Sequence, residues 1–193
     1  FTLDAARAVA EGQDTERLLT NLVEHSLVQR DDRADEVRFT LLETIRAYAL
    51  ARLAEHGEES SARDAHAAWF LRLAEASQAG LSGPEQTGWL QRVDADRDNL
   101  RGAFDWLLQR QAPELAGRLA VGLTVYWFQR DAFAEGQAAL RAARTSGGLS
   151  PDLLVSVLDC EAALTHYAGD YVHTEYLAQI LLTHGQQYGD PRS

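Results

Sequence analysis

Lysine is absent from the 193-residue sequence, as is methionine, and cysteine occurs once. A P-loop places a Lys on the nucleotide phosphates, and Schiff-base catalysis needs a Lys amine. The sequence therefore excludes both kinds of site. The lone Cys160 excludes an internal disulfide and is typical of a protein in a reducing cytoplasm, where we expect this one to be.

Long hydrophobic runs are also missing. No apolar stretch approaches the roughly 20 residues that cross a bilayer, and the first residues read as an amphipathic helix rather than a secretory signal. We therefore expect no membrane association. Because the chain starts at Phe1 and has no Met, we expect it to be a fragment of a longer protein.

Basic charge is scarce relative to acidic charge. The 18 basic residues, all Arg, face 29 Asp and Glu residues, which gives a formal net charge of -11. Affinity for duplex DNA comes from clustered basic side chains, so we expect this fragment not to bind nucleic acid. The most acidic short segment holds Asp31, Asp32, Asp35 and Glu36 against Arg30 and Arg33.

The stretch from Thr20 to Glu58 carries the clearest pattern, because its apolar period changes twice. Helical spacing gives way to two short alternating runs, SLVQR and VRFTLL, on either side of the acidic segment. Helical spacing then returns and ends at Gly57, a typical left-handed cap. The order helix, two-stranded wing, helix predicts a winged-helix-like domain over residues 1–58. Its expected helices are Leu3–Glu11, Thr15–His25 (capped by Asp14 or Thr15) and Glu43–His56.

Residues 59–193 show helical spacing throughout, with prolines at or near the breaks. Phe133 and Tyr171 begin similar segments 38 positions apart, each with a small residue three positions later, close to the tetratricopeptide period. We therefore predict a mainly α fold, in which the winged-helix-like domain precedes a tetratricopeptide-like array of helix hairpins. The expected helices are Ser61–Ala79, Glu85–Val93, Asp96–Gln111, Glu114–Arg130, Asp131–Thr145, Pro151–Ala168 and Tyr171–Tyr188.

Three segments carry a family likeness: LVEHSLV, RFTLLETIRAYALARLAEHGE and WLQRVDADRDNLRGAFDWLL. Together they resemble the region after the nucleotide-binding core in bacterial STAND regulators, the signal-transduction ATPases of the MalT, LuxR-type and AfsR-like kind. The resemblance covers roughly the whole chain. We expect both ends to be cut, the first because the chain starts at Phe1 without a Met and the second because YGDPRS ends between repeats. It also implies a non-catalytic interdomain and sensor role. A protein partner or small-molecule inducer would bind here, and ATP or ADP would bind a separate ATPase domain of the parent protein.

Some STAND relatives contact the nucleotide through a His-Asp pair before the last winged-helix helix. Leu42-Glu43 occupies the matching place, so the resemblance transfers no nucleotide-binding residue to this chain. We expect Leu42 in the core and Glu43 at a helix start. Two further functions remain open: a scaffold that tethers a protein without sensing a ligand, and DNA binding through the winged helix.

Tyr126, Trp127 and Arg130 form the candidate effector or partner surface. The run YWF at 126–128 covers nearly a full helix circumference, so at least one of its rings should face away from the main core. Packing between helices is the common role of such rings. We expect most of them in the core and predict that a peptide or small effector binds near these three residues.

Two other constellations resemble metal or catalytic sites, and neither has adequate spacing. Asp94, Asp96 and Asp98 alternate as in an EF-hand, but the required Gly and bidentate Glu are missing. Helix capping by Asp96 or Asp98 explains them better. Cys160 and the histidines of the last two expected helices lack metal-ligand spacing. We therefore expect no catalytic, metal or cofactor site and no enzymatic activity.

Overall fold

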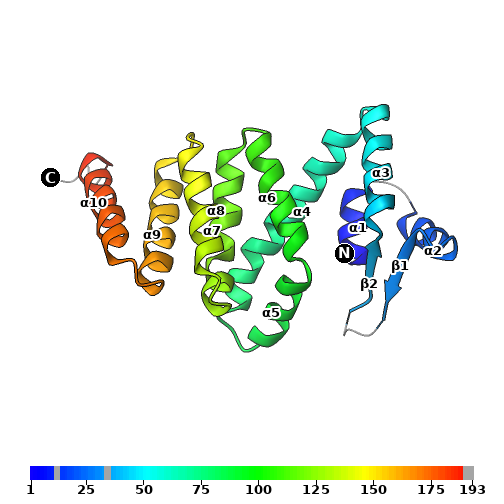
Figure 1. Cartoon of the computed structure of the whole chain (residues 1–193), viewed down its shortest axis with the longest axis horizontal. Coiled ribbons are helices and arrows are strands. Elements are labelled where there is room, and N and C mark those ends of the chain that lie inside the picture. The colour runs from blue at the N-terminus through cyan, green and yellow to red at the C-terminus, as the bar shows by residue number, and fades with distance from the viewer. Residues whose placement is uncertain (11–13, 33–35, 189–193) are drawn as a thin grey trace. The chain divides into compact units, whose positions relative to one another are not determined.

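The computed structural model describes residues 1–10, 14–32 and 36–188 (Figure 1). It falls into two compact units, Phe1–Trp69 and Phe70–Ser193. The division lies eleven residues after the predicted boundary, because one continuous helix, α4 (Glu59–Gly80), starts in the first unit and ends in the second. None of the described helices is both long and apolar enough to span a membrane.

The first unit has the order α1 (Leu3–Val9), α2 (Thr15–Glu24), β1 (Val28–Asp31), β2 (Arg38–Leu41) and α3 (Glu43–His56). The two strands pair antiparallel, with Val28 opposite Leu41 and Asp31 opposite Arg38. Thr2 forms an isolated antiparallel bridge to Arg38, which adds a short third segment to this sheet. The predicted helices followed by a two-stranded wing and a further helix are confirmed.

The chain delimits the helices of this unit through local chemistry. Asp14 is the N-cap of α2, and its carboxylate accepts a hydrogen bond from the Arg17 backbone N–H at 3.4 Å. Gly57 follows α3 with φ 73°, the left-handed conformation that glycine adopts without strain. Glu43 begins α3 as predicted. Leu42 does not lie in the core: it is the N-cap of α3, in an extended conformation, and is 47 % exposed.

A small apolar core joins the helices and the wing of the first unit. Leu19 of α2, Val28 of β1 and Phe39 of β2 are buried together. Phe1 stacks on Phe39 with ring centroids 5.8 Å apart, and the Phe1 carbonyl accepts a hydrogen bond from the Phe39 N–H at 2.8 Å. These contacts place α2 against the sheet and leave its other face in solvent.

The second unit contains the end of α4 and six further helices of the described chain. Each lies within a few residues of its predicted position. They are α5 (Gln86–Ala95), α6 (Arg97–Gln109), α7 (Pro113–Gln129), α8 (Phe133–Thr145), α9 (Pro151–Tyr167) and α10 (Tyr171–Tyr188).

The same backbone turn closes the two hairpins α7–α8 and α9–α10. Asp131 and Gly169 both adopt positive φ, 52° and 83°, one residue before the last loop residue of each hairpin. Their N–H groups donate back to Phe128 and His166 carbonyls, at 3.3 and 2.9 Å. The two turn residues are 38 positions apart, the spacing seen in the sequence. The hairpin repeat therefore exists in the structure; its tetratricopeptide identity stays a prediction.

Small residues allow close helix contacts in the second unit. A Cβ added to Gly122 of α7 would lie 2.8 Å from the Ala74 carbonyl carbon and oxygen in α4. A Cβ added to Gly136 of α8 would lie 2.4 Å from Leu164 of α9 and 2.8 Å from Trp127 of α7. The helix backbones consequently approach closely, and large side chains fill the space between them.

Candidate functional site

Helices α1 and α2 form the helix-turn-helix of the first unit, and the second helix of such a motif is the one that enters the major groove. The solvent side of α2 carries little positive charge. Its one Arg, Arg17, pairs with Asp14, with Nε 3.3 Å from the carboxylate. Glu16, next to it, pairs with Arg7 of α1 at 2.7 Å. Glu24 is a second exposed acidic residue on α2.

Two leucines stand beside the polar Thr20 and Asn21 on the remaining α2 surface. Leu18 and Leu22 lie one helical turn apart and are 38 % and 37 % exposed. Leu27, in the loop before β1, is 38 % exposed. A surface of this composition favours contact with another protein over contact with phosphates, since phosphate binding needs unpaired basic groups.

The wing is also acidic where it is described. Arg30 pairs with Asp32 at 2.7 Å, and Asp31 and Glu36 add further negative charge. Arg33 and Asp35, predicted members of the acidic tip, lie outside the described residues. Residues 1–58 together contain twelve Asp and Glu residues against seven Arg, a formal net charge of -5.

The predicted effector residues Tyr126, Trp127 and Arg130 lie at the end of α7. The two rings are each only 4 % exposed and therefore pack inside the second unit. The Tyr126 hydroxyl donates to Asp94 of α5 at 2.9 Å, and Arg130 pairs with the same carboxylate. Burial, followed by the hydrogen bond to Asp94, raises the pKa of Tyr126 to about 12. These contacts tie α7 to α5, and effector binding at these residues stays a prediction.

Phe128 is the ring of YWF that faces outward, as the helix geometry predicts. It is 42 % exposed. Its ring centroid lies 4.7 Å from that of Tyr167 and 6.1 Å from that of Phe133, both edge-on. The three rings connect the ends of α7 and α9 to the start of α8 at the hairpin turns.

The alternating aspartates have structural partners. Asp94 accepts hydrogen bonds from Tyr126 and Arg130. Asp96 is the N-cap residue of α6, but its carboxylate makes no capping hydrogen bond to the backbone; it accepts from the Asn99 side chain at 2.9 Å instead. The predicted capping role is therefore right in position and wrong in its hydrogen bond. Asp98 lies in the first turn of α6, where a negative charge is favourable.

Cys160 lies in α9 and is half-buried rather than fully in the core. Burial raises the pKa of its thiol, which disfavours the reactive thiolate. Among the residues that the structure describes, no group of three or more His, Cys, Asp and Glu is arranged to hold a metal ion.

A buried carboxylate in α9 is a feature that no sequence pattern indicates. Glu161 has no exposed surface, and Arg144 donates to it from α8 at 2.9 Å. Arg141 of α8 and His173 of α10 lie 3.3 and 3.6 Å from it. One charged side chain thus links three consecutive helices.

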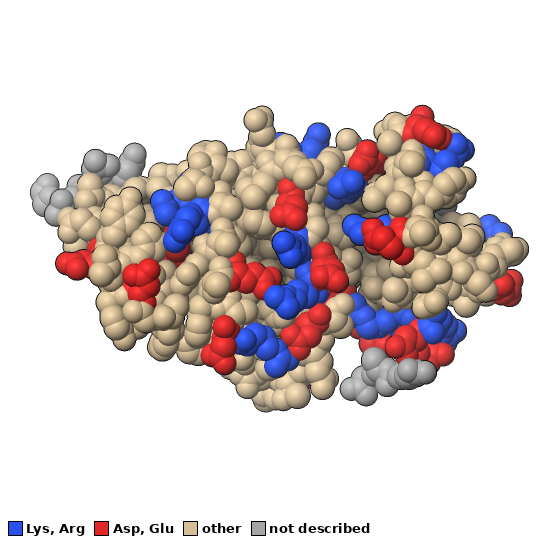
Figure 2. All heavy atoms as spheres, viewed as in Figure 1, with Lys and Arg blue, Asp and Glu red and all other residues tan. Residues whose placement is uncertain are grey.

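Elsewhere on the visible face in Figure 2, basic and acidic side chains are interspersed.

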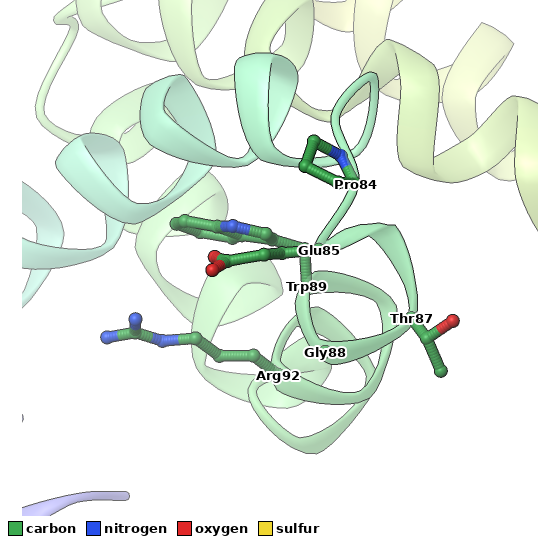
Figure 3. A pocket seen from close by; sticks show the side chains of 6 residues that line it. All are labelled: Pro84, Glu85, Thr87, Gly88, Trp89 and Arg92. Atoms are coloured by element: carbon green, nitrogen blue, oxygen red, sulfur yellow. The ribbon is translucent and has the colours of Figure 1, made fainter.

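A second feature absent from the sequence-based predictions is a hollow on α5 and the loop before it. Its volume is about 530 Å³, and it is broadly open to solvent. Figure 3 shows the side chains of Glu85, Trp89 and Arg92 extending in the same direction from this segment, while Thr87 points the opposite way. The signal in the sequence was the spacing 85, 89, 92, which places three residues on one helix face. The six lining residues are Pro84, Glu85, Thr87, Gly88, Trp89 and Arg92.

Comparison with known proteins agrees with the first unit of the fold. Residues 1–54 match the family model described as a winged helix-turn-helix domain. Relatives from Mycobacterium bovis and from two strains of Mycobacterium tuberculosis are 36 % identical over 141 residues; each is named "Putative HTH-type transcriptional regulator". The matched region is 70 % of this chain and 16 % of each relative. No solved structure matches the chain.

These findings show that the chain is similar to part of HTH-type transcriptional regulators, and they leave the ATPase-regulator resemblance as a prediction. Winged helix-turn-helix domains commonly bind DNA, so the family match favours a function that the acidic charge of this chain disfavours. The chain spans about a sixth of the length of the relatives it matches. Residues 1–54 thus form a winged helix-turn-helix domain, in a chain that is similar to part of HTH-type transcriptional regulators.

Proposed function

We propose that this chain is the non-catalytic interdomain and sensor part of a STAND-type transcriptional regulator in the cytoplasm. The helical second unit would bind an inducer or a partner protein. The winged helix would transmit that event to an ATPase domain that these 193 residues do not contain, since they have no lysine for a P-loop. ATP or ADP would bind in that ATPase domain.

The surface of α2 carries this proposal. In a DNA-reading domain this helix supplies unpaired Arg, Lys, Asn or Gln side chains to the base edges. Here the one Arg of the helix pairs with Asp14, Asn21 is the one other exposed side chain of that kind, and exposed leucines stand beside them. Leu18 and Leu22 are suited to an apolar contact with a neighbouring protein domain.

The proposed mechanism is a shift between two arrangements of the parent protein. One would keep the winged helix against the ATPase domain, and the other would release it for assembly. A ligand shifts this balance only as far as it binds one arrangement better than the other. The helix hairpins offer the extended surface that such selective binding needs.

The sensor and the scaffold can be separated by thermal unfolding of the 193-residue chain. A sensor gains stability from a small molecule, because ligand that binds only the folded state raises the melting temperature. Screening a panel of cytoplasmic metabolites should give at least one concentration-dependent increase. No increase from any of them, together with a stable complex with a protein partner, would favour the scaffold.

DNA binding through the winged helix is the second candidate, and the family match of residues 1–54 supports it. Titrating the chain into labelled duplex DNA at low salt distinguishes it from the proposal. Binding that weakens steeply with added salt would show phosphate contacts. That result would favour a winged helix that binds DNA over one that contacts protein.

A further inference from the structure

The hollow on α5 combines an indole with two charged side chains on one helix face. The guanidinium of Arg92 lies 5.5 Å from the centroid of the Trp89 ring, within the range of a cation–π contact. Trp89 is itself held in place, because its indole lies where a Cβ of Gly80 would be, 2.2 Å from that position. The stack therefore fixes the Arg92 side chain before any ligand arrives.

Neither charge of the hollow has an ion-pair partner in the described part of the chain. The Nε of Arg92 is buried and has no hydrogen-bond partner there. Glu85 is the N-cap residue of α5, but its carboxylate makes no capping hydrogen bond. Most other described arginines, such as Arg118 with Glu75 and Arg130 with Asp94, are paired with a carboxylate. Two opposite charges beside one ring can contact the two charged ends of a zwitterion.

We infer that this hollow binds an extended zwitterion across the Trp89 ring. Arg92 would receive the carboxylate end, since the planar guanidinium matches a carboxylate with two parallel hydrogen bonds. Glu85 would accept hydrogen bonds from the ammonium end. The apolar middle of the ligand would lie on the exposed part of the indole.

The spacing of the two residues along the helix gives a first measure of the ligand length. Glu85 and Arg92 are seven residues apart, and a helix rises 1.5 Å per residue, so their Cα atoms are separated by roughly 10 Å along the axis. An extended chain covers about 3.3–3.6 Å per residue. A tripeptide therefore has about the right length, as does an ω-amino acid of similar reach, whereas the charges of a single α-amino acid are too close together.

This inference gives the proposed sensor a class of ligand and depends on the proposed function for its biological role. The binding itself does not depend on it. A chain that binds the zwitterion and also binds DNA would keep this inference and overturn the proposed function. A chain that binds neither the zwitterion nor DNA would overturn this inference and keep the proposed function.

The test follows the indole N–H signals of the 193-residue chain by NMR, with the Trp89 signal assigned by Trp89→Phe. The probes are trialanine, 8-aminooctanoate and glycine, added to about 10 mM, which detects millimolar dissociation constants. We expect trialanine, 8-aminooctanoate or both to shift the Trp89 signal in a saturable way, and glycine to bind at least about tenfold more weakly. Shifts from trialanine alone would identify a peptide ligand, and shifts from the ω-amino acid alone an aliphatic one.

Variants test the role of each charge. Arg92→Gln and Glu85→Gln should each raise the Kd of the bound probe about tenfold, the loss expected for one charge-assisted contact. Arg101→Gln and Glu175→Gln make the same changes at exposed positions outside the hollow and should leave the Kd within about twofold. Equal binding of N-acetylated, C-amidated trialanine, or no shift from any probe, would overturn the inference.

Discussion

Arg144 of α8 donates a hydrogen bond through its Nε to the buried carboxylate of Glu161 in α9, at 2.9 Å. Arg141 and His173 lie beside the same carboxylate, so it connects α8, α9 and α10. A charge without solvent is tolerated only when it is paired and hydrogen-bonded. The packing of three consecutive helices therefore depends on one side chain.

Removing that charge should destabilise the second unit strongly. Glu161→Gln leaves Arg144, which is largely buried, without its ionic partner, and breaking a buried pair on one side costs about 3 kcal/mol or more. Urea unfolding followed by circular dichroism measures the change. Glu175→Gln, an exposed residue on α10, is the control and should stay within about 0.5 kcal/mol. Equal stability of the two variants would show that the buried contact contributes little.

Two glycine substitutions should have opposite effects. Gly122→Ala places a Cβ 2.8 Å from the Ala74 backbone, which cannot move aside as a side chain could, so we expect a loss of about 1–3 kcal/mol. Gly102→Ala in α6 meets no atom within 4 Å and should stabilise the helix by about 0.5–1 kcal/mol. The same unfolding experiment compares both. Stabilisation by Gly122→Ala would contradict the close approach of α4 and α7.

The raised pKa of Tyr126 predicts that the folded chain loses stability at high pH. Its pKa is raised to about 12 in the folded chain, mainly by burial, against an ordinary value of 10.0. The folded state therefore keeps the phenol proton where the unfolded state loses it. The contribution is complete below pH 10 and disappears between pH 10 and 12, by about 2 kcal/mol.

Comparing the native chain with Tyr126→Phe isolates that contribution from the other tyrosines. The variant should be less stable by about 1 kcal/mol near neutral pH, because the hydrogen bond to Asp94 is lost. The difference between the two chains should shrink above pH 10 and change sign before pH 12. A difference that stays constant from about pH 8 to 12 would mean that the Tyr126 hydroxyl titrates normally.

Periodicity and breaks in the sequence were sufficient to predict the helices and the wing. Local chemistry explains this success: Asp14 at the start of α2, Gly57 after α3 and the prolines at the starts of α7 and α9 act on their own segments. Burial of single residues was harder. Leu42 is apolar but marks a helix start, and its exposure depends on where the chain turns after β2.

The candidate site shows the same limit. The spacing of YWF predicts that one ring points outward, but only the positions of α5 and α9 determine that this ring is Phe128. The contact between Tyr126 and Asp94 joins residues 32 positions apart, and that between Arg144 and Glu161 joins two helices. No periodic pattern carries such a pair, since it depends on the packing of separate helices.

The direct test of a protein-facing winged helix is fluorescence anisotropy of labelled duplex DNA with the 193-residue chain, from about 20 to 200 mM salt. Clustered basic contacts would give a logarithm of affinity that falls linearly with the logarithm of salt concentration. A double variant, Glu16→Arg with Glu24→Arg, serves as a positive control because it adds basic charge to α2. We predict no binding by the native chain at any salt concentration and measurable binding by the variant. Salt-dependent binding by the native chain would contradict a winged helix that faces protein.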